Sequence, residues 1–162
     1  MLACFKLRAV PININYRYVE EELAYILGNA DLVACIHHRE FSPHIAAVRS
    51  TAPMLKTFIH VDDSSGADTA AIGSIAYEQA LAGQSAERSF PERADDDLFI
   101  LYTGGTTGMP KGVMWPHKHV FYAALGGGGY FHPDGVITQP EQIADRIGDF
   151  AIVGIALAPL MH

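Results

Sequence analysis

Apolar and β-branched residues occur in short runs in the first half of the chain, separated by stretches typical of helices. The runs predict strands at 9–15, 31–37 and 55–61. Helices are predicted between them at 19–28 and 43–50, and the first of these has acidic residues in its first turn and an apolar face. Strands that alternate with helices at this spacing predict an α/β fold, a doubly wound and mostly parallel sheet with flanking helices.

Two glycines are expected to end helices, because glycine is favoured at helix C-termini. Gly28 would end the helix at 19–28, and Gly83 would end a further helix at 75–81. The polar stretch 84–97 is predicted to be a loop. Beyond it the pattern predicts strands at 98–102, 113–115 and 150–157, and helices at 117–125 and 140–147.

One loop carries the clearest chemical signal. It follows the apolar run 98–102 and consists largely of glycines and threonines, with one lysine, Lys111. Glycines let backbone N–H groups approach an anion, threonine hydroxyls donate hydrogen bonds, and lysine supplies a positive charge on a flexible stem. This composition predicts a hairpin loop that binds a polyphosphate. The residues expected to bind it are Thr103, Gly104, Gly105, Thr106, Thr107, Gly108, Pro110 and Lys111.

The loop differs from the P-loop of nucleoside triphosphatases. In that motif the lysine is followed at once by a serine or threonine that binds Mg²⁺, and a helix begins there. Here Lys111 stands between Pro110 and Gly112, and the next residues predict a strand. The alternative without a ligand is a glycine-rich surface hairpin, although so long a motif rarely arises from turn chemistry alone.

The segment from Tyr102 to Val113 resembles the phosphate-binding signature of the adenylate-forming superfamily, Tyr-Thr-Ser/Gly-Gly-Thr/Ser-Thr-Gly-x-Pro-Lys-Gly-Val. It fits every fixed position, with Gly104 where Ser is the commoner residue. The superfamily includes acyl-CoA synthetases, luciferases and peptide-synthetase adenylation domains. Residues 4–13 and the final Pro-Leu-Met-His also resemble family segments, so the resemblance covers essentially the whole chain.

The resemblance implies that residues 1–162 are a partial AMP-binding domain, an incomplete part of the N-terminal domain of an acyl-CoA synthetase without the C-terminal subdomain. Full-length relatives use MgATP to activate a carboxylic acid, here expected to be a fatty acid, as an acyl-adenylate, and then form a thioester with CoA. Lys111 would neutralise the pyrophosphate leaving group, and His162 would lie near the acyl pocket. ATP, Mg²⁺ and CoA are implied, with the Mg²⁺ ligand outside this chain. The isolated chain is therefore expected to be inactive.

Composition narrows the function further. A net charge of -7 argues against a general nucleic-acid or membrane-surface role, so anion binding must be local. No apolar run reaches transmembrane length. Cys4 and Cys35 are far apart in sequence and predict buried, reduced thiols in a cytoplasmic protein.

The histidines and acidic residues predict no metal site. His37 and His38 would point to opposite faces of a strand, and the pair His117 and His119 lies at a predicted helix start without a nearby set of cysteines or carboxylates. The acidic run 95–97 is interpreted as a solvated approach to the strand that follows it.

Two other functions fit the same residues. The chain could be a non-catalytic fragment that self-associates or binds a partner through an uncovered sheet edge, which the apolar segment 150–161 suggests. It could also be the phosphate-binding domain of another enzyme that uses ATP.

Overall fold

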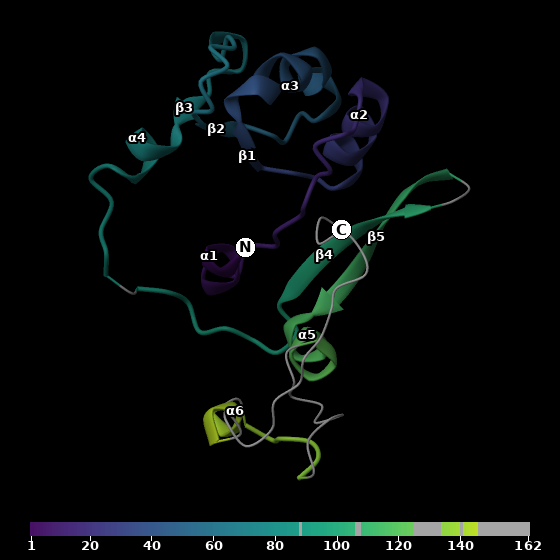
Figure 1. Cartoon of the computed structure of the whole chain (residues 1–162), viewed down its shortest axis with the longest axis vertical. Coiled ribbons are helices and arrows are strands. Elements are labelled where there is room, and N and C mark those ends of the chain that lie inside the picture. Colours follow the sequence, from purple (N-terminus) through teal and green to yellow (C-terminus); the bar gives the residue numbers. More distant parts are fainter. Residues whose placement is uncertain (88, 106–107, 125–133, 140, 146–162) are drawn as a thin grey trace. The chain divides into compact units, whose positions relative to one another are not determined.

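A computed structural model describes residues 1–87, 89–105, 108–124, 134–139 and 141–145. The chain divides into two compact units, which we describe separately: one of residues 14–89 and 104–111, the other of residues 1–13, 90–103 and 112–162 (Figure 1). In the described ranges, every helix is too short or too polar to cross a bilayer.

A three-stranded parallel sheet organises the first unit. Its strands are β1 (Ala34–His38), β2 (Thr57–Val61) and β3 (Ile75–Ala76), in that spatial order. Both pairings are parallel, and the register places His37 beside His60 and Ile59 beside Ile75. Parallel strands need crossover connections, and here helical segments supply them. The predicted parallel α/β sheet is thus confirmed.

Three α-helices accompany this sheet, together with short 3₁₀ turns (Figure 1). They are α2 (Glu20–Asn29), α3 (Ser42–Val48) and α4 (Tyr77–Leu81), and the turns are η1 (Arg39–Phe41), η2 (Arg49–Thr51) and η3 (Ala70–Ile72). Three glutamates occupy the first turn of α2, where negative charge is favourable. The Glu22 carboxylate also accepts a hydrogen bond from the Val19 backbone N–H at 3.1 Å, which fixes the beginning of the helix.

Apolar side chains from these elements form one buried cluster. The members are Leu23, Leu27, Ile45, Val48, Ala52, Leu55, Phe58 and Ile72. They come from α2, α3 and β2, from the connection between α3 and β2, and from η3. Burial of each large side chain contributes about 1.5–3 kcal/mol. The cluster therefore holds α2 and α3 against the sheet.

Two predicted boundaries in this unit are wrong. Gly28 does not end a helix, because α2 continues to Asn29. A Cβ at Gly28 would lie 3.1 Å from the carbonyl oxygen of Thr51, so this glycine permits close packing of the helix against η2. At 75–81 only the part from Tyr77 is helical, since Ile75 and Ala76 pair with β2 as β3.

The remaining elements are α1 (Leu2–Lys6), β4 (Leu98–Gly105), β5 (Gly108–Pro116), α5 (His117–Ala124) and α6 (Gln142–Asp145). They confirm helices within the predicted ranges 117–125 and 140–147, whereas the predicted strand 150–157 lies outside the described residues.

The predicted strand at 9–15 is wrong. Among the described residues of that segment, only Ile12 forms a β-bridge, a parallel one with Ile100. Pro11 has no N–H to donate to a neighbouring strand. Arg8, just before the segment, has a left-handed φ of 56°, which interrupts the extended backbone.

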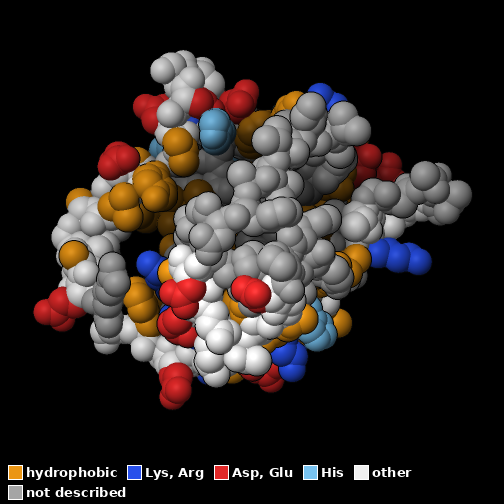
Figure 2. Space-filling view, turned by 60° about the horizontal axis from the view of Figure 1, so that its bottom comes forward, with side chains coloured by type: hydrophobic (Ala, Val, Ile, Leu, Met, Phe, Trp, Pro, Cys, Tyr) orange, Lys and Arg blue, Asp and Glu red, His pale blue; other side chains and the backbone are white. Residues whose placement is uncertain are grey.

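Charged side chains are dispersed over the face seen in Figure 2. In this view acidic and basic side chains both appear among hydrophobic and neutral ones.

Replacement of Leu27 by alanine is expected to lower the free energy of unfolding by about 2–5 kcal/mol, because Leu27 is 1% exposed and its removal leaves a cavity. The control is Leu81→Ala, since Leu81 is 51% exposed and its loss should change the free energy by about 0.5 kcal/mol or less. Urea unfolding followed by circular dichroism measures both. Equal effects of the two substitutions would contradict the assignment of the core.

Candidate functional site

The predicted phosphate-binding residues lie in a hairpin formed by β4 and β5 (Figure 1). The hairpin itself confirms the prediction, but its strands are longer than expected. β4 continues through Thr103 to Gly105, and β5 begins at Gly108. Extended backbone therefore includes most of the segment predicted to be a loop, and the connection is reduced to residues 106–107. Thr106 and Thr107 lie outside the described residues.

Glycine suits two positions of the hairpin for different structural reasons. Gly108 has a φ of 144°, which L side chains rarely adopt, and a Cβ there would meet nothing within 4 Å. Its backbone is thus open to approach. Gly112 is itself exposed, but a Cβ there would lie 3.1 Å from the Tyr102 ring and 3.2 Å from Ile100 Cγ2. Gly112 therefore lets the two strands pack tightly.

Among the residues of β5, Pro110 is buried and its neighbours on both sides are exposed. Two residues after Pro110, Gly112 faces the side chains of β4. Lys111 stands between them and is exposed, as are Met109 and Val113. Lys111 is accessible to solvent and follows the open backbone at Gly108 by three residues on the same strand. The arrangement can present a cation and an accessible backbone to a dissolved anion.

The carboxylate of Asp97 anchors the base of the hairpin, although the sequence pattern suggested that it is solvated. The Asp97 side chain is 9% exposed and forms an ion pair with Arg8, with Arg8 Nη2 2.9 Å from Asp97 Oδ1. Asp97 also accepts hydrogen bonds from the Arg8 Nε at 2.9 Å and from the Ala94 backbone N–H at 3.0 Å. These bonds, that from Ala94 above all, lower the pKa of Asp97. The interpretation of 95–97 as simply solvated is thus wrong for Asp97, whereas Asp95 and Asp96 are exposed.

The backbone of Asp97 joins the same anchor to α5. Its carbonyl oxygen accepts a hydrogen bond from the His117 N–H at 2.8 Å. The ring of Phe5 packs against the ring of His117, with centroids 4.3 Å apart, and meets Phe99 edge-on at 6.1 Å. These contacts tie α1, the start of β4 and the start of α5 together. Arg8 and Asp97 are 89 residues apart, so no local pattern could have paired them.

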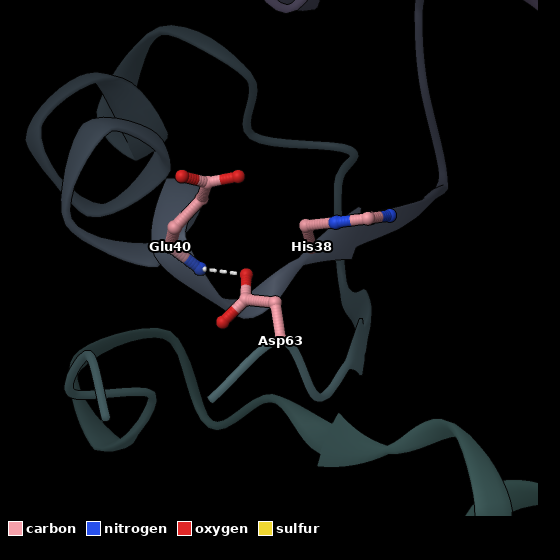
Figure 3. Close-up of side chains that lie close together, drawn as sticks. All are labelled: His38, Glu40 and Asp63. Atoms are coloured by element: carbon pink, nitrogen blue, oxygen red, sulfur yellow. Dashed lines mark hydrogen bonds between the residues drawn. The ribbon is translucent and has the colours of Figure 1, made fainter. Parts of the chain in front are cut away.

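A second set of polar side chains gathers at the carboxyl ends of β1 and β2. His38, Glu40 and Asp63 each place one ligand-type atom within 4.8 Å of the others (Figure 3). The Asp63 carboxylate accepts the Glu40 N–H at 2.8 Å and the Ser65 N–H at 3.0 Å. Hydrogen bonds from Ser65 and from Glu40 lower the pKa of Asp63 to about 2. These hydrogen bonds explain the position of the Asp63 carboxylate, which accepts backbone N–H groups of the surrounding loops. We therefore assign no ligand to the cluster.

The histidine and cysteine predictions have mixed outcomes. His37 is buried and His38 exposed, which confirms that they point to opposite faces. Cys4 and Cys35 are free thiols, each only partly exposed, and burial raises the pKa of Cys35 to about 11. His162, the predicted residue of the acyl pocket, lies outside the described residues, as does the apolar segment 150–161.

Comparison with known proteins identifies the family. The family model described as "AMP-binding enzyme" matches residues 1–156, nearly the whole chain. The chain belongs to this family. The resemblance predicted from Tyr102–Val113 is therefore confirmed.

Curated relatives of this AMP-binding chain are acyl-CoA ligases. It is 47% identical over 163 residues to a 3-oxocholest-4-en-26-oate–CoA ligase of Rhodococcus rhodochrous, covering 100% of this chain and 29% of the relative. It is 44% identical over 162 residues to a medium/long-chain-fatty-acid–CoA/3-oxocholest-4-en-26-oate–CoA ligase of Mycolicibacterium smegmatis, with the same coverage. The chain thus spans about 29% of the length of these relatives.

Solved structures of adenylate-forming enzymes confirm the fold. A crystal structure of an anthranilate CoA ligase in complex with anthranoyl-AMP matches with a TM-score of 0.61 and 29% identity, covering 70% of this chain and 21% of that one. An acetoacetyl-CoA synthetase from Streptomyces lividans matches with a TM-score of 0.60 and 19% identity, covering 79% and 21%. At the latter identity the likeness shows the fold alone.

Replacement of Asp97 by asparagine is expected to loosen the base of the hairpin, because the neutral amide cannot form the ion pair with Arg8. Hydrogen–deuterium exchange should accelerate at the amides of Ala94 and Ile100. The matched control Asp96→Asn, at an exposed neighbour, should leave both rates unchanged.

The same anchor should depend on pH. Because the pKa of Asp97 is lowered in the fold, its contribution is complete above the ordinary value of 3.8 and is lost as pH falls through the lowered value. Slow exchange at Ala94 in the asparagine variant would show that the charge of Asp97 is not what holds the anchor.

Proposed function

We propose that the β4–β5 hairpin of this chain binds the β- and γ-phosphates of ATP, as part of an acyl-CoA ligase that activates a carboxylic acid as an acyl-adenylate. One observation carries the proposal: the family signature coincides with a hairpin whose backbone is open at Gly108 and whose exposed Lys111 follows three residues later. Open backbone and a nearby cation are what a polyphosphate requires.

The chemistry of the proposed reaction is substitution at phosphorus. A carboxylate oxygen of the acid attacks the α-phosphorus of ATP, and the bond from that phosphorus to the bridging oxygen breaks, so pyrophosphate leaves with the electron pair. Negative charge grows on the leaving group. The role proposed for Lys111 is to neutralise this charge, while Thr103 to Gly108 hold the phosphates in position. Pro110, which is buried, would restrict the backbone before the lysine.

The proposed substrate is a carboxylic acid with a large apolar body. The two relatives described above are named for fatty acids and for a steroid side-chain acid, which share a carboxyl group and an extended hydrocarbon part. A fatty acid is thus our first choice and a steroid acid the second. His162 is proposed to lie near the acyl pocket.

The complete ligase reaction is proposed for a protein that also carries the other regions of these relatives, because this chain spans 29% of their length. We propose residues 1–162 as a partial AMP-binding domain. Mg²⁺ would accompany ATP without a protein ligand from the signature, which contains no carboxylate. CoA would be the acceptor in the second step, and the cytoplasm the proposed location.

A second candidate is a non-catalytic segment that self-associates. It is favoured by the position of β1 at an edge of the described three-stranded sheet and by the exposure of Val33 (61%) and Ile36 (60%). An uncovered edge with apolar neighbours invites pairing with a second copy. Oligomers in size-exclusion chromatography together with no affinity for ATP would favour this candidate.

Replacement of Lys111 by alanine is expected to weaken MgATP binding about 10- to 150-fold, the effect of losing one charge-assisted hydrogen bond. Isothermal titration calorimetry on the folded chain measures the dissociation constant. Lys118→Ala is the matched control, since Lys118 is also exposed but lies on α5 outside the signature. Equal affinity of the Lys111 variant and the wild-type chain would refute the proposed phosphate contact.

The 162-residue chain by itself is expected to bind ATP without turnover. Pyrophosphate release from MgATP should stay at background with fatty, steroid side-chain and aryl acids alike. Robust release that depends on an added acid would show that the chain is a complete catalyst and that its proposed status as a partial domain is wrong.

A further inference from the structure

Two histidines lie buried side by side in the parallel sheet. His37 on β1 and His60 on β2 are register partners, each is 8% exposed, and their ring centroids are 6.5 Å apart. His60 follows Phe58 by two residues, so both rings lie on the face of the sheet that contributes Phe58 to the core. Polar groups buried there need hydrogen-bond partners.

A serine hydroxyl connects the two rings. His37 Nε2 is 3.4 Å from Ser74 Oγ, and His60 Nδ1 is 3.0 Å from the same oxygen. The other nitrogen of His37, Nδ1, is 2.8 Å from the backbone carbonyl oxygen of His38. Ser74 immediately precedes β3, so this chain of contacts joins all three strands of the sheet.

The chemistry of the partners fixes the direction of every hydrogen bond when both rings are neutral. A carbonyl oxygen only accepts, so His37 must carry its hydrogen on Nδ1. Its Nε2 is then an acceptor, and the single hydrogen of the Ser74 hydroxyl must point to it. The Ser74 oxygen is thereby left to accept from His60, which must carry its hydrogen on Nδ1. His60 thus donates to Ser74, Ser74 donates to His37, and His37 donates to the His38 carbonyl.

We propose that the hydrogen-bonded side chains His60, Ser74 and His37 form a pH-sensitive latch of the three-stranded sheet. All hydrogen bonds of the latch can form when both rings are neutral or when one extra proton is bound, and a second proton breaks it. The proposal concerns the sheet and does not depend on phosphate binding.

Addition of one proton reverses the two hydrogen bonds at Ser74 and leaves the bond from His37 Nδ1 to the His38 carbonyl unchanged. A protonated His37 donates from both nitrogens, so its Nε2 now donates to Ser74. The hydroxyl turns to donate to His60 Nδ1, and His60 moves its own hydrogen to Nε2. A second proton leaves both rings as donors to one oxygen, so the hydroxyl hydrogen has neither ring as an acceptor, and two cations face each other in a buried site.

The groups around His37 act in both directions. Burial is the main influence and lowers the pKa of His37, and the nearby rings of His60 and His38 lower it further, whereas the hydrogen bond to the His38 carbonyl and the negative charge of Asp63 raise it. Unfolded His37 therefore binds a proton more readily than folded His37. Stability is complete above the ordinary value of 6.5 and decreases as pH falls through 6.5 toward the lowered value.

The decisive measurement is the tautomer of each ring, read from long-range ¹⁵N–¹H correlations of the 162-residue chain at about pH 7.5. We expect His37 and His60 both to carry hydrogen on Nδ1, whereas the exposed His119 should show the Nε2–H form that free imidazole favours. A His37 or His60 ring with hydrogen on Nε2 at that pH would overturn the proposal, and so would a chain without folded signals.

A variant and a thermal measurement test the latch independently. Ser74→Ala should return His60 to the Nε2–H form, whereas Ser85→Ala, at an exposed serine, should leave both rings unchanged. The thermal midpoint of the wild-type chain should be lower at about pH 5.5 than at about pH 7.5, because the pKa of His37 is lowered in the fold. A midpoint that is constant over this range would refute the latch even if the Ser74 variant did not fold.

Discussion

The pairing of β4 with β5 is the constraint on which the candidate phosphate site depends. At Gly112 a Cβ would press against the Tyr102 ring and Ile100, so the hairpin is packed most closely with glycine at this position. The same pairing holds Gly105 and Gly108 at the two ends of a short connection and leaves Lys111 exposed. The orientation of the binding groups is thus set by strand pairing, which is more rigid than a free loop. A P-loop, by contrast, takes its orientation from the helix that follows it.

Local signals explain which parts of the fold could be predicted from the sequence. Acidic residues before an apolar face predicted α2, and alternating strands and helices predicted the parallel sheet. The signature between Tyr102 and Val113 predicted both the hairpin and the family. Each of these depends on residues that are close together in the chain, where spacing translates directly into geometry.

The failures concern contacts between distant residues. Gly28 was expected to end a helix, but it lies within α2, where a Cβ would be 3.1 Å from the carbonyl oxygen of Thr51 and glycine allows this close approach. Asp97 looked like one of three solvated acids, yet it pairs with Arg8, 89 positions earlier. The segment 9–15 has strand-like residues but forms a single bridge, because pairing requires a partner with free donors and acceptors along its length. Tertiary contacts determined the outcome of all three predictions, and such contacts cannot be read from a short stretch of sequence.

The acidic character of the chain does not oppose phosphate binding as strongly as its net charge suggests. Charges beyond about 8 Å are largely screened at physiological ionic strength. Asp97, an acid close in sequence to the hairpin, is already neutralised by Arg8 and by the Ala94 amide. In the proposed site, affinity for an anion would therefore depend on short contacts to backbone N–H groups and to Lys111, and long-range attraction would contribute little.

The buried histidine pair shows the same dependence on backbone geometry. Gly73 has a left-handed φ of 63° and ends η3, and the next residue, Ser74, donates its N–H to the Thr69 carbonyl at 3.2 Å. The position of the Ser74 hydroxyl is thus fixed by the turn before any ring contacts it. The partner of His37 Nδ1 is likewise a backbone group, the carbonyl oxygen of His38. Ser74 and the His38 carbonyl thus belong to backbone that is held by its own hydrogen bonds, and the two rings can keep their contacts with these groups by changing which nitrogen carries hydrogen.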